Sequence, residues 1–155
     1  MASETDKNAL LSLIQGTEGK VWSSEKNGWS SKSLVPVCEW EGITCKVGMS
    51  GALAKVTTIR LPDVGLSGTL PTELGKLTFL EELNLKGNLI QGSIPSDLAA
   101  LPKLSLLDLS DCLLTGTLPD RFESPILKKL LLSENGISGQ FFVTRHRYIC
   151  NLSRK

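Results

Sequence analysis

Apolar residues return along most of the chain at a fixed interval. The positions that repeat with an offset of 24 residues include three leucines, three glycines and three prolines: Leu61, Leu85 and Leu109; Gly68, Gly92 and Gly116; Pro71, Pro95 and Pro119. A fourth copy follows one residue short, with Leu132 and Gly139 in the same places. A period of this length predicts a stack of similar coils, because a single coil cannot enclose its own apolar side chains.

The pattern divides into four coils, at residues 56–79, 80–103, 104–126 and 127–142. Each coil begins with alternating apolar residues such as Leu83-x-Leu85, which is typical of a short strand with alternate residues facing inward. Neighbouring coils then place their strands side by side, so we expect a parallel sheet that grows by about 4.8 Å per coil. The third coil loses its residue near Pro125, which we expect to contract only its convex side.

The residue after each strand predicts how the coil turns. Asn88 and Asn135 occupy this position in the second and fourth coils, where an inward amide can bond backbone groups that water cannot reach. Cys112 takes the place in the third coil, where we expect a buried and inert thiol. Val64 takes it in the first coil, which weakens the predicted turn ladder. The repeated glycines then bend the coil again, and the prolines keep it from extending the sheet.

Residues 1–55 precede the coils and form a predicted cap. A helix is expected over residues 5–16, with Thr5 or Asp6 as its N-cap and Gly16 as its end. The apolar face of this helix has helical spacing and consists of Ala9, Leu10, Leu13 and Ile14.

The rest of the cap is less regular. Residues 17–37 are rich in Ser, Lys, Asn and Gly, and they indicate irregular structure anchored by Trp22 and Trp29. Residues 38–45 follow with a cysteine at either end, and a polar turn over residues 46–52 leads into the first coil.

The repeat pattern stops after residue 142, and residues 143–155 form an atypical tail that matches no further coil. The exposed end of a stack needs a cover. Either this tail improvises one, a partner supplies it, or the natural protein is longer. Cys150 lies in the tail as a leftover cysteine, either a free thiol or one half of a pair whose partner is missing.

Charge and hydropathy narrow the classes of function. The 155 residues carry 17 Lys and Arg against 16 Asp and Glu, a net charge of +1, which argues against a nucleic acid or a membrane surface as partner. The basic residues of the tail fit a solvated segment: Arg145, His146, Arg147, Arg154 and Lys155. No apolar run approaches the ~18 residues that cross a bilayer, and residues 1–6 do not resemble a signal peptide, although a removed leader stays an alternative.

These motifs together resemble the plant-type leucine-rich repeat family, found in receptor-like kinase ectodomains and small secreted repeat proteins. The cap carries Cys38-x-Trp40-x-Gly42-Ile43-x-Cys45, and the coils carry second halves such as Leu66-Ser67-Gly68-Thr69-Leu70-Pro71. The resemblance implies an α/β fold: a leucine-rich repeat solenoid of about four coils with a parallel concave sheet and an N-terminal helical cap. It also implies a second small strand in each coil, 3₁₀ turns more than α-helix on the convex side, and an extracellular or cell-surface location.

The resemblance further implies a disulfide between Cys38 and Cys45. On the chain-entropy estimate, a loop this short stabilises the fold by roughly 2–3 kcal/mol. Bound zinc is disfavoured, because the chain has four cysteines, one histidine and no second pair at ligand spacing. We expect no cofactor, no metal and no enzyme, since the single histidine, His146, has no partners for a nucleophilic triad.

The outward residues between the inward leucines define a candidate concave binding face. Its members are Thr58, Arg60, Glu82, Asn84, Lys86, Leu106, Asp108, Ser110, Lys129, Leu131 and Ser133. Leu106 and Leu131 are expected to be exposed apolar residues among polar ones, and such a pair can form the dry centre of a contact with a charged rim. The alternative is that scattered surface leucines have no function.

The sequence therefore favours a protein- or peptide-binding module. The resemblance implies a receptor or co-receptor in signalling or defence, with a larger receptor as a further candidate partner. One alternative is an inhibitor of a cell-wall-degrading hydrolase, a function that similar but longer proteins perform. The other is an ice- or polysaccharide-binding surface on the second ridge of the coils. That ridge carries hydroxyl and amide side chains: Ser67, Thr69, Gln91, Ser93, Thr115, Thr117, Ser138 and Gln140.

Overall fold

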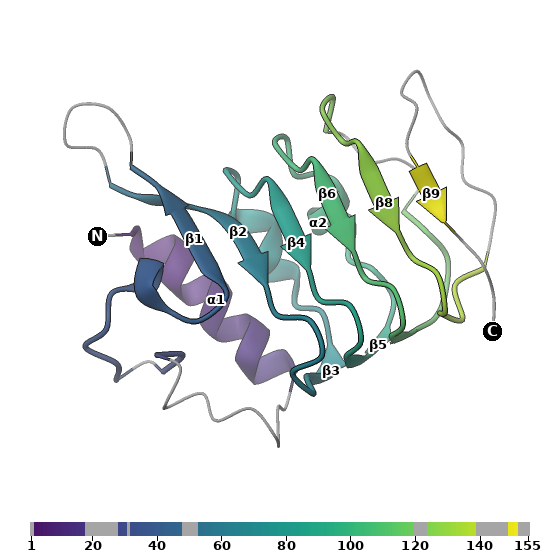
Figure 1. Cartoon of the computed structure of the whole chain (residues 1–155), viewed down its shortest axis with the longest axis horizontal. Helices are drawn as coiled ribbons and strands as arrows, with labels where there is room; N and C mark the ends of the chain where they lie inside the picture. The colour runs from purple at the N-terminus through teal and green to yellow at the C-terminus, as the bar shows by residue number, and fades with distance from the viewer. Residues whose placement is uncertain are drawn as a thin grey trace.

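The computed structural model describes residues 2–17, 28–30, 32–47, 53–119, 124–138 and 149–151. Its main feature is a six-stranded sheet in the order β1-β2-β4-β6-β8-β9 (Figure 1). The strands are β1 (Ile43–Lys46), β2 (Lys55–Arg60), β4 (Glu82–Asn84), β6 (Leu106–Asp108), β8 (Lys129–Leu131) and β9 (Ile149–Asn151). All neighbours from β2 onward pair in parallel, which confirms the predicted solenoid with its parallel sheet.

The register of the sheet places equivalent residues of successive coils beside one another. Ile59 pairs with Leu83, Leu83 with Leu107, and Leu107 with Leu130. All four side chains are fully buried, as are the leucines of the next inward column: Leu61, Leu85, Leu109 and Leu132. The 24-residue period thus becomes a continuous apolar column, and its burial is the main contribution to stability.

A second, three-stranded sheet lies beyond the ends at which the main strands point (Figure 1). It consists of β3 (Ser67–Thr69), β5 (Leu89–Gly92) and β7 (Leu113–Leu114), all parallel. This is the second small strand that the family resemblance implies. Gly68 adopts φ 114°, and a Cβ there would collide with the carbonyl oxygen of Gly16, so only glycine fits where the first coil meets the cap.

The convex side differs from coil to coil. The first coil carries a 3₁₀ helix, η2 (Thr72–Lys76), and the second carries a one-turn α-helix, α2 (Ser96–Ala99). Pro71 and Pro95 immediately precede these helices as their N-caps, where a missing N–H costs no helical hydrogen bond. The third-coil contraction was predicted near Pro125, and residues 120–123, which precede it, lie outside the described residues.

The cap helix α1 (Glu4–Gly16) packs its apolar face against the first coil and contacts η2. Its N-cap is Ser3, not Thr5 or Asp6 as predicted: the Ser3 Oγ accepts the Asp6 N–H at 3.1 Å and donates to the Asp6 carboxylate at 2.6 Å. The second oxygen of Asp6 accepts the N–H of Val56 at 3.1 Å. Asp6 thus lies in the first turn of α1 with its side chain buried, and its carboxylate connects α1 to β2.

The cap also contributes a strand that the sequence pattern did not predict. β1 runs antiparallel to β2 and starts the sheet, following the short 3₁₀ helix η1 (Val37–Glu39). Trp29 and Trp40 pack with ring centroids 5.2 Å apart. The Trp29 Nε1–H donates to the carbonyl of Glu41 and the Trp40 Nε1–H donates to that of Val35. Trp29 is therefore an anchor as predicted, whereas Trp22 lies outside the described residues.

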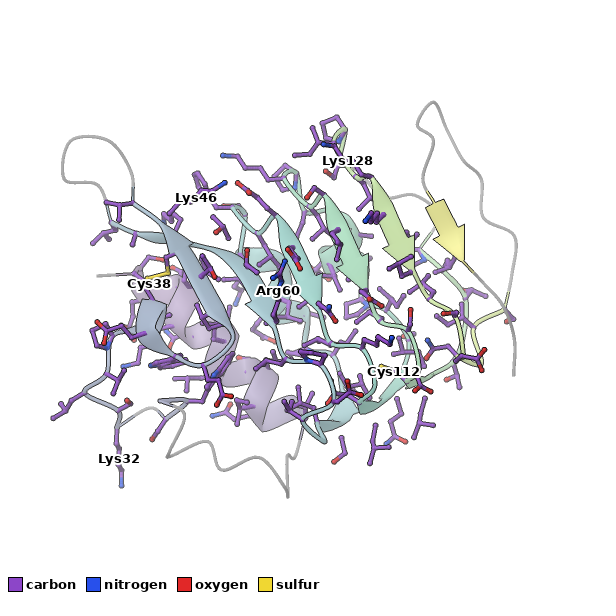
Figure 2. All side chains as sticks on the ribbon, viewed as in Figure 1. Lys32, Cys38, Lys46, Arg60, Cys112 and Lys128 are labelled. Atoms are coloured by element: carbon purple, nitrogen blue, oxygen red, sulfur yellow. A yellow bond between two sulfur atoms is a disulfide. The ribbon has the colours of Figure 1, made fainter. Side chains whose placement is uncertain are left out.

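The disulfide between Cys38 and Cys45 is present in the cap (Figure 2). It joins η1 to β1 and so fixes the irregular segment against the sheet. In the described part of the chain, no helix is long and apolar enough to span a membrane.

Asn88 forms the predicted turn ladder. Its amide nitrogen donates to the carbonyls of Leu61 and Leu85 at 2.8 and 2.7 Å, and its Oδ1 accepts the N–H of Leu66 at 3.0 Å. Asn135 repeats these bonds in the fourth coil. Cys112 stands between them, buried, with its thiol 3.5 Å from the Leu85 carbonyl.

The C-terminal tail takes part in the main sheet at its last strand. Residues 143–155 match no coil in sequence, yet β9 pairs in parallel with β8 and adds a strand to the main sheet. Cys150 takes the register position beside Leu130, so the backbone continues the stack without the repeat motif. Gly139, His146 and the ends of the tail lie outside the described residues.

Candidate protein-binding face

The candidate concave residues form rows across the main sheet. Thr58 pairs with Glu82, Glu82 with Leu106, and Leu106 with Lys129. The next row aligns in the same way and consists of Arg60, Asn84, Asp108 and Leu131. Because each residue belongs to a different coil, the sheet brings together side chains far apart in sequence (Figure 2).

The third row lies where the strands end. Backbone hydrogen bonds connect the coils there, from the Gly87 N–H to the Ser110 carbonyl and from the Asp111 N–H to the Ser133 carbonyl. Lys86 is exposed at this end of the face. An open hollow of about 580 Å³ lies beside it, lined by Lys86, Asp108, Ser110, Asp111, Leu131, Ser133 and Glu134.

An ion pair crosses the first two strands of this face. Arg60 Nε lies 2.6 Å from Glu82 Oε1, and its NH2 group lies 2.9 Å from Oε2. The hydrogen bond and the negative charge of Glu82 raise the pKa of the Arg60 guanidinium. Both side chains are accordingly held in one orientation, which gives the face a fixed charged feature.

Two expectations about exposure are wrong. Leu106 and Leu131 are half-buried rather than exposed, because neighbouring coils cover their flanks. Asp108 and Ser110 are buried, and the Asp108 Oδ1 accepts the N–H of Ser110 at 3.0 Å. The accessible part of the face therefore consists mainly of its charged and amide side chains, with the two leucines as a recessed apolar strip.

Comparison with known proteins agrees with this architecture. The family described as Leucine rich repeat N-terminal domain matches residues 3–46. The family described as Leucine Rich Repeat matches residues 79–101 and 103–125, so that the two together cover more than half of the chain. This chain belongs to the plant-type leucine-rich repeat family.

The relatives of this leucine-rich repeat chain are plant receptor kinases. Receptor protein kinase WSS1 of Oryza sativa subsp. japonica is 39% identical over 88 residues, which are 57% of this chain and 8% of the receptor. The chain spans about a tenth of the length of the curated relatives that it matches.

Solved structures show the same relationship. The BIR2 ectodomain from Arabidopsis thaliana is 28% identical with a TM-score of 0.74, and the match covers 88% of this chain and 70% of that one. The ectodomain of the Arabidopsis receptor kinase HAESA, solved with an IDA peptide hormone, is 31% identical with a TM-score of 0.69. That match covers 85% of this chain and 21% of HAESA.

The second ridge of this leucine-rich repeat domain is less uniform than its hydroxyl pattern indicates. Leu89 and Leu113 lie in its strands with 55% and 53% of their surfaces exposed. They share an open hollow of about 490 Å³ with the end of α1 and with Ser67, Thr69 and Gln91. These leucines were not among the predicted site residues, although they occupy the same place in two consecutive coils, which was a readable signal.

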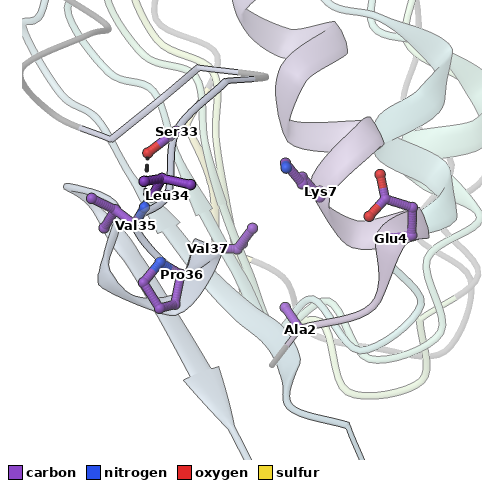
Figure 3. A pocket seen from close by; sticks show the side chains of 8 residues that line it. All are labelled: Ala2, Glu4, Lys7, Ser33, Leu34, Val35, Pro36 and Val37. Carbon is purple, nitrogen blue, oxygen red and sulfur yellow. Dashed lines mark hydrogen bonds between the residues drawn. The ribbon is translucent and has the colours of Figure 1, made fainter.

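A smaller hollow of about 220 Å³ lies in the cap (Figure 3). Glu4 and Lys7 on α1 border one side of it, and the loop from Ser33 to Val37 borders the other. The Ser33 Oγ accepts the N–H of Val35 at 3.1 Å, and Leu34 projects almost fully into solvent. No group of three or more potential metal ligands occurs among the residues for which the structure gives a position.

The free cysteine Cys112 lies at the strand-end edge of the repeat domain, away from the disulfide (Figure 2). Burial raises the pKa of its thiol, and the nearby carboxylates of Asp111 and Asp108 act in the same direction. A protonated, buried thiol is a poor nucleophile, so Cys112 fits a packing role.

Proposed function

We propose that this chain is a non-catalytic module that binds a protein or peptide on its concave face, in the manner of a receptor or co-receptor at the cell surface. The observation that carries the proposal is the alignment of Glu82, Leu106 and Lys129 in one row of a rigid parallel sheet. Charged side chains around a recessed apolar strip are typical of protein contact surfaces.

The relatives support the same proposal. HAESA was solved with a peptide hormone, and the homologous curated proteins are named as receptor kinases. We propose an extracellular or cell-surface location because the chain is similar to receptor ectodomains. An inhibitor of a cell-wall-degrading hydrolase would use the same face, and an inhibition assay separates that alternative.

Binding can be tested with the purified chain on a biosensor, with IDA peptide and the BIR2 ectodomain as probes. The double variant Lys86→Glu/Lys129→Glu reverses two exposed charges on the face. The matched control, Lys32→Glu/Lys76→Glu, makes the same charge change on the cap and the convex side. We expect the face variant to weaken binding of a probe roughly tenfold and the control to leave it unchanged. Equal binding by both variants contradicts the proposed face.

A further inference from the structure

A row of residues lies along the edge at which the main strands begin, one from the end of the cap and one from the end of each of the first three coils. Backbone hydrogen bonds of 2.8 Å connect the coils here. The N–H of Glu81 donates to the backbone carbonyl of Thr57, that of Ser105 to the carbonyl of Glu81, and that of Lys128 to the carbonyl of Ser105. Two positions before each of these residues lies a side chain at the edge of the sheet. We call this row the strand-start rim: Lys55, Phe79, Lys103 and Ile126.

The rim holds two positive charges around one aromatic ring. The Lys103 Nζ lies 3.9 Å from the centroid of the Phe79 ring, and the Lys55 Nζ lies 5.8 Å from it. The electron-rich face of the ring attracts both ammonium groups. Phe79 remains 40% exposed and Ile126 47% exposed, so apolar surface alternates with the two charges.

Among the described residues, the two carboxylates at the start of β4 are already engaged. Both oxygens of Glu81 accept the Lys46 ammonium at 2.7 Å, and Glu82 pairs with Arg60. Within the described part of the chain, no carboxylate lies within ion-pair distance of Lys55, Lys103 or Lys128. Lys46 and Lys128 lie along the same edge in Figure 2. Because Glu81 neutralises Lys46, the surplus of positive charge in the described part of this edge comes from Lys55, Lys103 and Lys128.

We infer that the strand-start rim docks an acidic segment of a partner protein, one in which aliphatic side chains alternate with carboxylates. Carboxylates of the partner would pair with Lys55 and Lys103, and its apolar side chains would contact Phe79 and Ile126. The Lys103 ammonium covers one face of the Phe79 ring, so the ring is a poor platform for stacking a sugar. Complementary charge therefore favours an acidic partner. The exposed apolar surface of Phe79 and Ile126 favours a peptide chain over an acidic polysaccharide, because a peptide can supply aliphatic side chains. This inference does not depend on the concave face.

The test uses the whole chain and a short fluorescein-labelled peptide of repeating Glu-Glu-Leu, followed by fluorescence anisotropy. The variant Lys55→Ser/Lys103→Ser removes the two rim charges. The control Lys32→Ser/Lys76→Ser makes the same net change on the cap and on the convex side, where both lysines are exposed. We expect the rim variant to weaken binding roughly tenfold and the control to weaken it less than twofold.

A second variant isolates the ring. Phe79→Leu keeps an apolar side chain but loses the attraction for the two ammonium groups, so we expect a loss of about threefold in affinity with an unchanged far-ultraviolet circular dichroism spectrum. Equal effects of the rim and control variants overturn the inference. The inference is also overturned if an oligogalacturonide binds at the rim and the peptide does not. Lys86 and Lys129, which test the concave face, lie outside the rim. Neither result therefore bears on the concave-face proposal, which is tested by its own experiment.

Discussion

The thiol of Cys112 donates to the carbonyl oxygen of Leu85, at a distance of 3.5 Å. The same carbonyl accepts the amide of Asn88 from its own coil. Cys112 therefore occupies the ladder position of the third coil. It makes one weak sulfur hydrogen bond to the previous coil, whereas an asparagine at the equivalent position makes several stronger hydrogen bonds.

Replacing Cys112 by asparagine should complete this ladder. By analogy with Asn88, the new amide would reach the carbonyls of Leu85 and Leu109 and the N–H of Ile90. We expect Cys112→Asn to raise the free energy of unfolding by about 1 kcal/mol, measured by urea denaturation. Cys112→Ala is the control and should lower it. A Cys112→Asn protein less stable than the parent would show that the third turn cannot accommodate the amide.

The buried thiol also predicts a dependence of stability on pH. Burial raises the pKa of Cys112 in the folded state, so the folded chain keeps its proton where the unfolded chain begins to lose it. Above about pH 8.5 the unfolded state is favoured progressively, and the stability contribution is lost as pH rises through the raised folded pKa.

The measurement compares the unfolding free energy of the Cys150→Ser chain with that of Cys150→Ser/Cys112→Ala, at about pH 7 and about pH 10. The difference between the two proteins should shrink at the higher pH. In the same Cys150→Ser background, Cys112 should resist a thiol reagent at neutral pH until the chain unfolds. Rapid labelling of the native protein would disagree with a buried, protonated thiol.

The two asparagines of the ladder should differ in their contribution to stability. Asn88 is buried, whereas Asn135 is half-buried, although both make the same backbone bonds. Asn88→Ala leaves the Leu66 N–H and the Leu61 carbonyl without these partners, so we expect a loss of about 3 kcal/mol. Asn135→Ala should cost about half as much, because water can reach its partners. Thermal denaturation measures these losses. The control is Asn84→Ala on the open face, which should cost less than either ladder variant.

The disulfide of the cap makes a separate contribution. The pair Cys38→Ser/Cys45→Ser opens a loop with a sequence separation of 7, and we expect a loss of roughly 2–3 kcal/mol in the free energy of unfolding. Chemical denaturation of the variant, in parallel with the parent under non-reducing conditions, measures the loss. Addition of a reductant should bring the parent to the variant's stability, and a parent that reductant leaves unchanged would speak against this contribution.

The repeat period predicted the coils, the inward columns and the ladder of Asn88 and Asn135, because these features depend on side chains that recur at the same place. The disulfide came from family resemblance and not from the period. The N-cap was missed because Ser3, Thr5 and Asp6 all have side chains that can cap a helix. Only packing decides that the Asp6 carboxylate reaches Val56.

Strands at the two ends of the sheet could not be read from the period. β1 belongs to the cap, and β9 belongs to the tail, and neither carries the leucine motif. The alignment of Glu82 with Leu106 and Lys129 follows from strand alternation, whereas their use as a binding face stays a prediction. The exposure of Leu106 was predicted wrongly, because it depends on how closely adjacent coils pack. Phe79 was taken as an end of a coil, and its contact with Lys103 appears only once two coils are stacked.

The pairing of Glu82 with Leu106 and of Leu106 with Lys129 has a consequence for how such a protein changes in length. Duplication of residues 80–103 would insert one more strand, widen the molecule by about 4.8 Å, and present another copy of Glu82, Asn84 and Lys86 without disturbing its neighbours. A single inserted residue within β4 would instead turn every later side chain of that strand to the opposite side. Within the strands, evolution of this molecule is therefore constrained to the addition or loss of whole coils, whereas the convex side has lost a single residue in the third coil.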